Sequence, residues 1–227
     1  MSTRGERVMT FDGQSAVGAI ARGRERRGLG TATEEVLRLL EDARRDEKQV
    51  AEPCRFDQIP LTKLIAYLID KHHVYARRQV AGISALLAEL SDAHEKIRPE
   101  LTRVRGLFKV LRQELLFHME KEEVSLFPHI IRTEMAAGGD EPQANPYFGS
   151  MRDPVRMLMH EHDQLCAMLD EIRAATNDYT PPLDACASYR TLCLALRDLE
   201  FDFLQLIHLQ DNILFPRALR LERGECS

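Results

Sequence analysis

Apolar residues recur every three or four positions along four long stretches of the chain, and this is the period of an amphipathic helix. The breaks between the stretches are rich in proline, glycine and asparagine, as loops are. Long amphipathic helices joined by loops pack with their apolar faces inward. We therefore predict an all-α fold, an antiparallel four-helix bundle over residues 57–223. The four stretches are Leu61 to about Ala93, about Glu100 to Thr133, Asp153 to the loop at Asn177, and Leu183 to Arg220.

The second predicted helix carries two ionisable residues on its apolar face. His118 and Glu122 are four residues apart, so their side chains lie about 40° from each other around the helix axis. An unpaired buried carboxylate costs several kcal/mol or takes up a proton. A metal ion removes this cost, because it binds carboxylate and neutral imidazole together. The pair therefore predicts a metal site in the core. Its apolar neighbours on the same face are Val104, Leu111, Leu115 and Leu126.

Histidines also fall on the apolar faces of the first and third helices. His73 is in step with the core positions of the first helix, whereas His72 is about 100° away. His162 is in step with the core positions of the third helix, and His160 is about 200° away on a polar face. We expect His73 and His162 to point inward and His160 to lie at the surface. On the first helix alone, a merely amphipathic role for both histidines remains open.

The second and fourth helices share the short motif Leu-Phe-Pro, which ends at Pro128 and at Pro216. The histidine and glutamate of the second helix stand ten and six residues before the first proline. Leu206 and Gln210 stand at the same positions before the second. Leucine cannot bind a metal, and a neutral amide is a poorer ligand than a carboxylate. The fourth helix therefore has the ligand positions without the ligand chemistry.

Two residues near these positions are candidates to replace the lost ligands. His208 and Asp211 lie about 200° and 140° from Leu206 on a regular helix. A π-bulge would turn Asp211 inward, and such bulges cluster at functional sites. Asp211 would then replace the carboxylate, while His208 or a water molecule would replace the imidazole.

Residues 1–56 differ from the rest of the chain, and we expect them to form a partly flexible N-terminal extension. Up to about residue 30 the sequence is charged and has no apolar face. One short amphipathic helix is predicted over residues 33–49, with Thr31 or Thr33 as its cap.

Composition narrows the class of protein further. The formal net charge of −5 argues against nucleic acid as the main partner. No apolar run reaches about 18 residues, and the first residues lack the apolar core of a signal peptide. The 5 cysteines include no C-x-x-C pair, which fits a reducing compartment. We expect a cytoplasmic protein that neither binds nucleic acid nor enters a membrane.

Four segments together carry a family resemblance: Asp70-Lys-His-His-Val-Tyr75, Phe117-His-Met-Glu-Lys-Glu-Glu123, Met157-Leu-Met-His-Glu-His-Asp163 and Asn212-Ile-Leu-Phe-Pro-Arg-Ala218. Over about residues 57–221 the chain resembles the RIC proteins (repair of iron centres), which are hemerythrin-like cation-binding bundles. The resemblance implies a hemerythrin-type fold and a non-haem di-iron site, with a histidine from each helix and two bridging glutamates. It also implies reactivity with nitric oxide and oxygen species, and a role in restoring damaged iron–sulfur clusters.

Carried over residue by residue, the family's ligands fall on His73, His118, Glu122 and His162. The fourth histidine and the second bridging glutamate of the family fall on Leu206 and Gln210. These two substitutions put the second iron in doubt, so we predict an impaired site that holds one iron, or a second iron only weakly, in place of a full oxo-bridged pair. Glu161, beside an inward histidine, is a candidate to hydrogen-bond a ligand or to line an access path. The adjacent Cys-Cys-Gly-Gly of the family's N-terminal domain is absent from this chain.

Three functions follow from these residues. In the first, His73, His118 and Glu122 hold one iron with open positions for nitric oxide or oxygen, while His162 faces the lost half. Such a protein would serve the nitrosative and oxidative stress response, with iron–sulfur proteins as partners. In the alternative, a degenerate family member acts as an interaction or regulatory module without a functional di-iron centre. The third is an enzyme that activates oxygen with one iron. No catalytic residue is identified, so enzymatic activity stays open.

Overall fold

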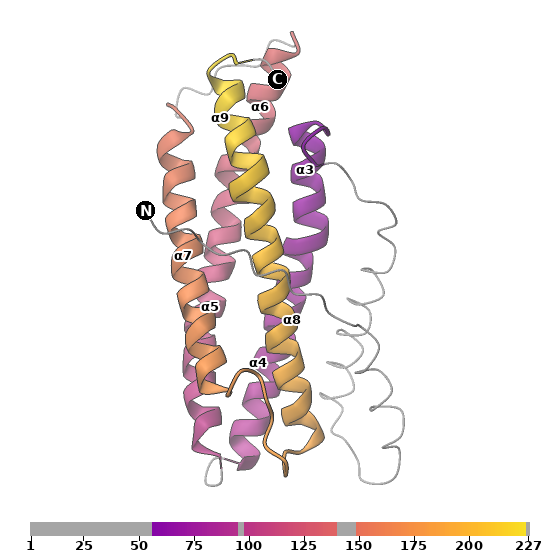
Figure 1. Cartoon of the computed structure of the whole chain (residues 1–227), viewed down its shortest axis with the longest axis vertical. Helices are drawn as coiled ribbons and strands as arrows, with labels where there is room; N and C mark the ends of the chain where they lie inside the picture. Colours follow the sequence, from indigo (N-terminus) through magenta and orange to yellow (C-terminus); the bar gives the residue numbers. More distant parts are fainter. Residues whose placement is uncertain (1–55, 95–97, 140–148, 226–227) are drawn as a thin grey trace, which may run out of the picture. The chain divides into compact units, whose positions relative to one another are not determined.

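The computed structural model describes residues 56–94, 98–139 and 149–225, and these residues form helices and turns without a β-strand. The predicted helix at 33–49, and the extension up to residue 55, lie outside the described residues. The described helices run antiparallel as a four-helix bundle (Figure 1), which confirms the predicted fold class.

Each long predicted helix is a continuous rod, and three of the rods contain a short π-helical segment. The first rod consists of α3 (Leu61–Tyr67), η1 (Leu68–His73) and α4 (Val74–His94). The second consists of α5 (Pro99–Lys121), η2 (Glu122–Leu126) and α6 (Phe127–Ala137). The third is α7 (Arg152–Ala175), and the fourth consists of α8 (Ala187–Leu209), η3 (Gln210–Leu214) and α9 (Phe215–Glu222).

The apolar faces of the rods meet in one core. In Figure 1 the rods lie side by side, with α4 against both α5 and α8, and α5 against α7. Core side chains such as Ile83, Phe108 and Leu196 are at most 1% exposed. Burial of such a side chain contributes about 1.5–3 kcal/mol, so the period of three and four residues is what selects the bundle.

Pro128 and Pro216 stand at equivalent places in the second and fourth rods. Each proline lies two residues after the end of a π-helical segment, η2 in the second rod and η3 in the fourth. A proline ring crowds the carbonyl four residues before it, and here that carbonyl lies within the wider π-turn. The sequence predicts a kink or break at Pro128. The structure accommodates the proline after a widened turn and the helix continues into α6, so the helix does not break there.

Each Leu-Phe-Pro motif is also followed, six residues after its proline, by a glutamate that caps the start of another rod. Glu134 accepts hydrogen bonds from the backbone N–H groups of Leu61 at 2.6 Å and Thr62 at 2.8 Å. Glu222 accepts one from the N–H of Met151 at 2.7 Å and one from the hydroxyl of Ser150 at 2.9 Å. The internal repeat therefore extends beyond the candidate ligands to the contacts that fix rod ends.

The fourth rod starts at Ala187, four residues later than predicted. The intervening residues form a turn in which the Arg190 guanidinium donates to the carbonyls of Leu183 and Ala185, both at 3.2 Å. These bonds give the backbone polar groups partners outside a helix, so the apolar character of Leu183 does not extend the helix. Leu183 is 100% exposed.

None of the described helices is both long enough and apolar enough to cross a membrane. The described bundle begins at Leu61 and ends at Glu222. These bounds lie within the predicted domain, residues 57–223, whose limits stay a prediction.

Candidate metal centre

Side chains from three rods converge at mid-height in the core. His73 ends η1, His118 is in the last turn of α5, Glu122 opens η2, and His162 lies in the middle of α7. All four are at most 1% exposed. These are the four positions that the sequence predicts as ligands, and the structure brings them together.

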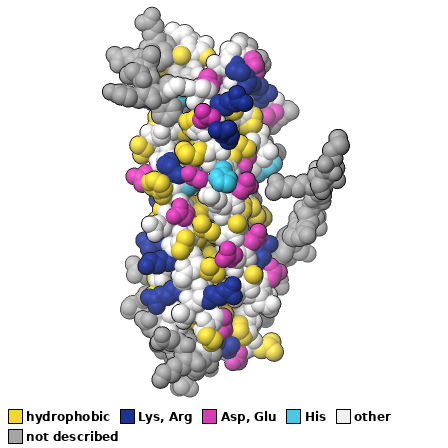
Figure 2. All heavy atoms as spheres, turned by 90° about the vertical axis from the view of Figure 1, so that its left-hand side faces the viewer, with side chains coloured by type: hydrophobic (Ala, Val, Ile, Leu, Met, Phe, Trp, Pro, Cys, Tyr) yellow, Lys and Arg dark blue, Asp and Glu magenta, His cyan; other side chains and the backbone are white. Residues whose placement is uncertain are grey.

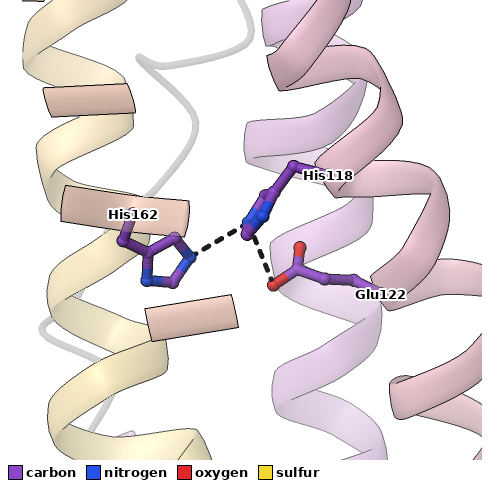
Figure 3. Close-up of side chains that lie close together, drawn as sticks. All are labelled: His118, Glu122 and His162. Atoms are coloured by element: carbon purple, nitrogen blue, oxygen red, sulfur yellow. Dashed lines mark hydrogen bonds and ion pairs between the residues drawn. The ribbon is translucent and has the colours of Figure 1, made fainter. Parts of the chain in front are cut away.

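The closest contacts involve the Nε2 atoms of the rings. His118 Nε2 lies 3.0 Å from His162 Nε2 and 3.5 Å from Glu122 Oε1. In Figure 3 both rings and the carboxylate point toward a common space between α5 and α7. One ligand atom from each of these three residues lies within 4.8 Å of the others. On the other side of the carboxylate, His73 Nε2 lies 3.2 Å from Glu122 Oε2.

The outer nitrogen of the His73 ring is held by a carboxylate from a neighbouring rod. His73 Nδ1 donates to Glu123 Oε1 at 2.6 Å. The Arg77 guanidinium in turn binds both oxygens of Glu123, each at 2.9 Å. A proton on Nδ1 leaves the Nε2 lone pair pointing inward, as metal-binding histidines require.

The other two rings are held in the same way. His118 Nδ1 donates to Glu161 Oε2 at 3.0 Å, and Lys121 forms an ion pair with the other oxygen of that glutamate. His162 Nδ1 donates to Asp211 Oδ1 at 2.9 Å. All three rings are therefore fixed through Nδ1 and turn Nε2 into the core, toward the buried carboxylate or toward the neighbouring ring.

Glu122 is the least satisfied charged group of the site. It is fully buried, and neither oxygen accepts a properly directed hydrogen bond from any described residue. Burial by itself would raise the pKa of Glu122, but contact with His73 outweighs burial and holds that pKa below its ordinary value. The carboxylate is thus kept ionised in a core where an unpaired charge is costly.

The pKa values of His73 and His118, the two histidines in contact with Glu122, are shifted in opposite directions. Burial would lower the pKa of His73, but Glu122 and Glu123 outweigh it and raise that pKa above the usual range. Burial lowers the pKa of His118, and the neighbouring His162 adds to this effect while Glu122 opposes it. Neutral His118 is the form that binds metal.

These donors fit a transition-metal ion. Two nitrogen ligands about 2.1 Å from one ion and at a right angle to each other are about 3 Å apart. The separation of 3.0 Å between His118 Nε2 and His162 Nε2 matches such a pair. Two imidazoles and a carboxylate are a donor set that iron accepts, with positions left for other ligands. An ion would also satisfy the orphaned oxygens of Glu122.

The grouping differs from the sequence-based expectation in one respect. His73 was expected to share an ion with His118 and Glu122, while His162 faced the lost half. The structure brings His162, rather than His73, to His118 and the near oxygen of the carboxylate. His73 stands at the far oxygen. A helical wheel gives the face of each residue but not its depth between rods, so the sequence did not decide this.

The substituted positions lie in the same core. Leu206 is 1% exposed and Gln210 is fully buried. Neither side-chain atom of Gln210 that can hydrogen-bond has a partner among the described residues. Both residues are therefore buried, as the periodicity of the fourth helix predicts, and they bring an apolar and a neutral side chain to these positions.

The structure places the two candidate replacements away from a bridging position. The π-helical segment that the sequence suggested is present as η3, and it turns Asp211 toward the outer nitrogen of His162. His208 is exposed, and its Nδ1 accepts a hydrogen bond from Asn212 Nδ2 at 3.3 Å. Asp211 thus orients a ring, and His208 lies at the surface.

Residues outside the predicted ligand set also belong to this region. Glu123 is one of them, because its carboxylate holds His73. The internal repeat carries a signal for this role, because Glu123 and Asp211 both stand five residues before their prolines. His72 is buried too, and its Nδ1 donates to Asp202 at 2.9 Å, because α8 packs on that side of η1. His160 is exposed, as predicted.

Comparison with known proteins shows what this arrangement is similar to. Residues 64–218 match the model of the hemerythrin HHE cation binding domain. The chain is 34% identical over 170 residues to the iron-sulfur cluster repair protein YtfE of Yersinia pestis (strain Pestoides F). It is 35% identical over 170 residues to the protein of the same name from Yersinia pseudotuberculosis serotype O:1b (strain IP 31758). Each alignment covers 74% of this chain and 70% of the relative.

Proposed function

The chain belongs to the hemerythrin HHE cation-binding family, and from this membership we propose that it is a cytoplasmic non-haem iron protein of the nitrosative and oxidative stress response. The observation that carries the proposal is the set of three buried imidazoles around Glu122, each fixed through Nδ1 by a carboxylate. Such outer carboxylates set the tautomer and the direction of metal-binding histidines.

His118, His162 and Glu122 Oε1 are the proposed ligands of one iron, and His73 stands at the other carboxylate oxygen. Bound iron would supply open coordination positions for a small diatomic ligand and a change of oxidation state. The chain's own contribution is to keep water out of the core, to hold protons on the three Nδ1 atoms and to leave the Nε2 lone pairs free.

We further propose that the site is impaired and holds a single metal. Leu206 and Gln210 support this, because they occupy the two positions where the family resemblance implies a histidine and a bridging glutamate. Asp211 is engaged with His162 and His208 is exposed, so the described residues offer no ready substitute for the lost pair.

Nitric oxide or oxygen is the proposed small ligand, and repair of iron–sulfur clusters is the proposed role, with iron–sulfur proteins as partners. The name shared by the Yersinia relatives, iron-sulfur cluster repair protein, supports this role. Cytoplasmic location is supported by the cysteine pattern of the chain.

The test is metal analysis of protein produced with iron in the medium. The parent is expected to carry iron, and His118→Ala is expected to lose it, since that change removes a ligand from the centre. His160→Ala is the matched control, because this exposed histidine lies on α7 and outside the site. A parent that contains neither iron nor another transition metal would rule out the proposal.

The second candidate function is an interaction or regulatory module without a functional di-iron centre. Leu206 and Gln210 favour it, because a bundle that needs no second metal can lose those ligands at no cost to its fold. A triple variant with alanine at His73, His118 and His162 would then keep its function in cells. Loss of that function in a folded triple variant would count against the module.

A further inference from the structure

Gln210 is the most poorly satisfied neutral side chain near the proposed centre. It is fully buried, and neither its amide nitrogen nor its amide oxygen has a hydrogen-bond partner among the described residues. Burial of an amide without partners is costly, and native cores avoid it or use it for function. A leucine of similar volume would remove that cost.

The internal repeat relates Gln210 to the metal centre. Gln210 is the first residue of η3, as Glu122 is the first residue of η2. The residue after each of them holds the outer nitrogen of a site histidine: Glu123 holds His73, and Asp211 holds His162. The repeat therefore predicts that Gln210 stands near His162 as Glu122 stands near His73, whose Nε2 lies 3.2 Å from the carboxylate.

The protein around this position offers the amide little to bind. Leu206 carries no polar atom, and the rings of Phe203 and Phe215 lie against His162 with centroids 6.3 and 6.1 Å away. Gln210 itself adjoins Asp211, which contacts His162, and the described side chains offer its amide no polar partner. What satisfies it has to come from outside the described protein atoms.

We propose that the Gln210 amide is a hydrogen-bond donor to a small anionic or diatomic ligand that enters the metal centre. This inference rests on the proposed function, because the ligand needs the ion as its anchor. A neutral amide supplies two N–H donors, and a donor facing a negatively charged acceptor makes the stronger kind of hydrogen bond. A glutamate at the same place would repel an anion. Glutamine in place of a glutamate thus removes a metal ligand but provides a hydrogen-bond donor for the small ligand.

Azide is a suitable probe, because it is a small anion with terminal acceptor atoms and it can be titrated against the iron-loaded protein by its optical change. In Gln210→Leu, the azide dissociation constant is expected to rise about tenfold, the loss that corresponds to one hydrogen bond to a charged group. Iron content is expected to stay at the parent level. Gln210→Met, a second apolar variant of similar length, is expected to behave alike and covers the case in which leucine packs badly.

Gln79→Leu is the matched control. Gln79 is also buried, its Oε1 is also without a partner among the described residues, and it lies two turns beyond His72 on α4. The same change of side chain at that position is expected to leave azide binding unchanged. An equal loss in both variants would mean that the effect comes from packing, and it would overturn the inference.

A second readout uses the metal-free protein. Because Gln210→Leu removes two orphaned polar atoms, the melting temperature of the metal-free variant is expected to equal or exceed that of the parent. A lower melting temperature together with unchanged azide affinity would overturn the inference, since the amide would then have a structural partner. The two proposals fail separately. A parent without iron contradicts the proposed function, whereas a parent that binds iron and azide with no change in Gln210→Leu contradicts only the role of Gln210.

Discussion

The second and fourth rods of the bundle are built to one plan and differ in their chemistry. Each has a π-helical segment before its proline, an acid after the first residue of that segment, and a capping glutamate six residues after the proline. The second rod carries His118 and Glu122, whereas the fourth carries Leu206 and Gln210 at the same positions.

The two rods therefore share their capping contacts and their π-helical segments while their inner positions carry different side chains. Asp211 contacts His162 although its neighbour in the fourth rod is a glutamine and not a carboxylate. The contacts that orient a ligand and the atoms that bind the metal are thus separate parts of the design, and experiments can test them separately.

The largest effect is expected from Glu122→Gln. This change keeps the side-chain shape but removes the charge that the three imidazoles face, so iron affinity should fall by more than about a hundredfold, beyond the loss seen for outer contacts. Iron retention during dialysis against a chelator measures it. Glu120→Gln, an exposed residue on α5, is the control and should retain iron as the parent does.

A second prediction concerns a variant in which the fourth rod carries the metal-ligand residues of the second rod. The double variant Leu206→His with Gln210→Glu puts the ligand types of the second rod into the equivalent positions. Its iron content is expected to rise from about one to about two per chain, because both substitutions supply donors that iron accepts. Metal analysis with a protein assay measures the ratio. No increase in a folded double variant would mean that the fourth rod has lost more than these two side chains.

A smaller effect is expected from Asp211→Asn. Loss of a carboxylate that orients a metal-binding histidine typically reduces metal affinity about 10- to 100-fold. Asp163→Asn, an exposed change on α7, should have no effect. Complete loss of iron in Asp211→Asn would instead indicate a direct ligand, as the sequence alone had suggested. Competition with a chelator of known affinity separates the two results.

The smallest effect is expected at the capping glutamates. Glu134→Ala should lower the free energy of unfolding of the metal-free protein by about 1 kcal/mol, because two backbone N–H groups at the start of α3 lose their acceptor. Urea unfolding at neutral pH measures the change. Glu120→Ala, at an exposed position, serves as the control.

The same variant gives a pH test. Burial by itself would raise the pKa of Glu134, but its hydrogen bonds with Thr62 and Leu61 hold that pKa below the ordinary value of 4.5. The stabilisation is therefore present above pH 4.5 and is lost as the pH falls through the folded-state pKa. The stability difference between parent and Glu134→Ala should shrink in that acidic range. A difference that is constant with pH would contradict the ionic character of this cap.

Sequence periodicity was sufficient to predict the four rods and to put His73, His118, Glu122 and His162 in the core. Periodicity predicts these features because the apolar face of each helix in the sequence is the face that the bundle buries. Periodicity could not predict that Asp211 orients His162, because a helical wheel of about 100° per residue does not hold across a π-turn. The depth of His73 relative to His162 was also beyond it, because depth depends on how the rods pack against one another.

The most direct test of the proposed single-metal centre is the ratio of iron to protein in the parent, taken together with its optical spectrum. About one iron per chain, without the absorption of an oxo-bridged pair, is expected from a centre with leucine and glutamine in its second half. About two irons per chain with that absorption would contradict the impaired site and would mean that a complete dinuclear centre forms despite Leu206 and Gln210.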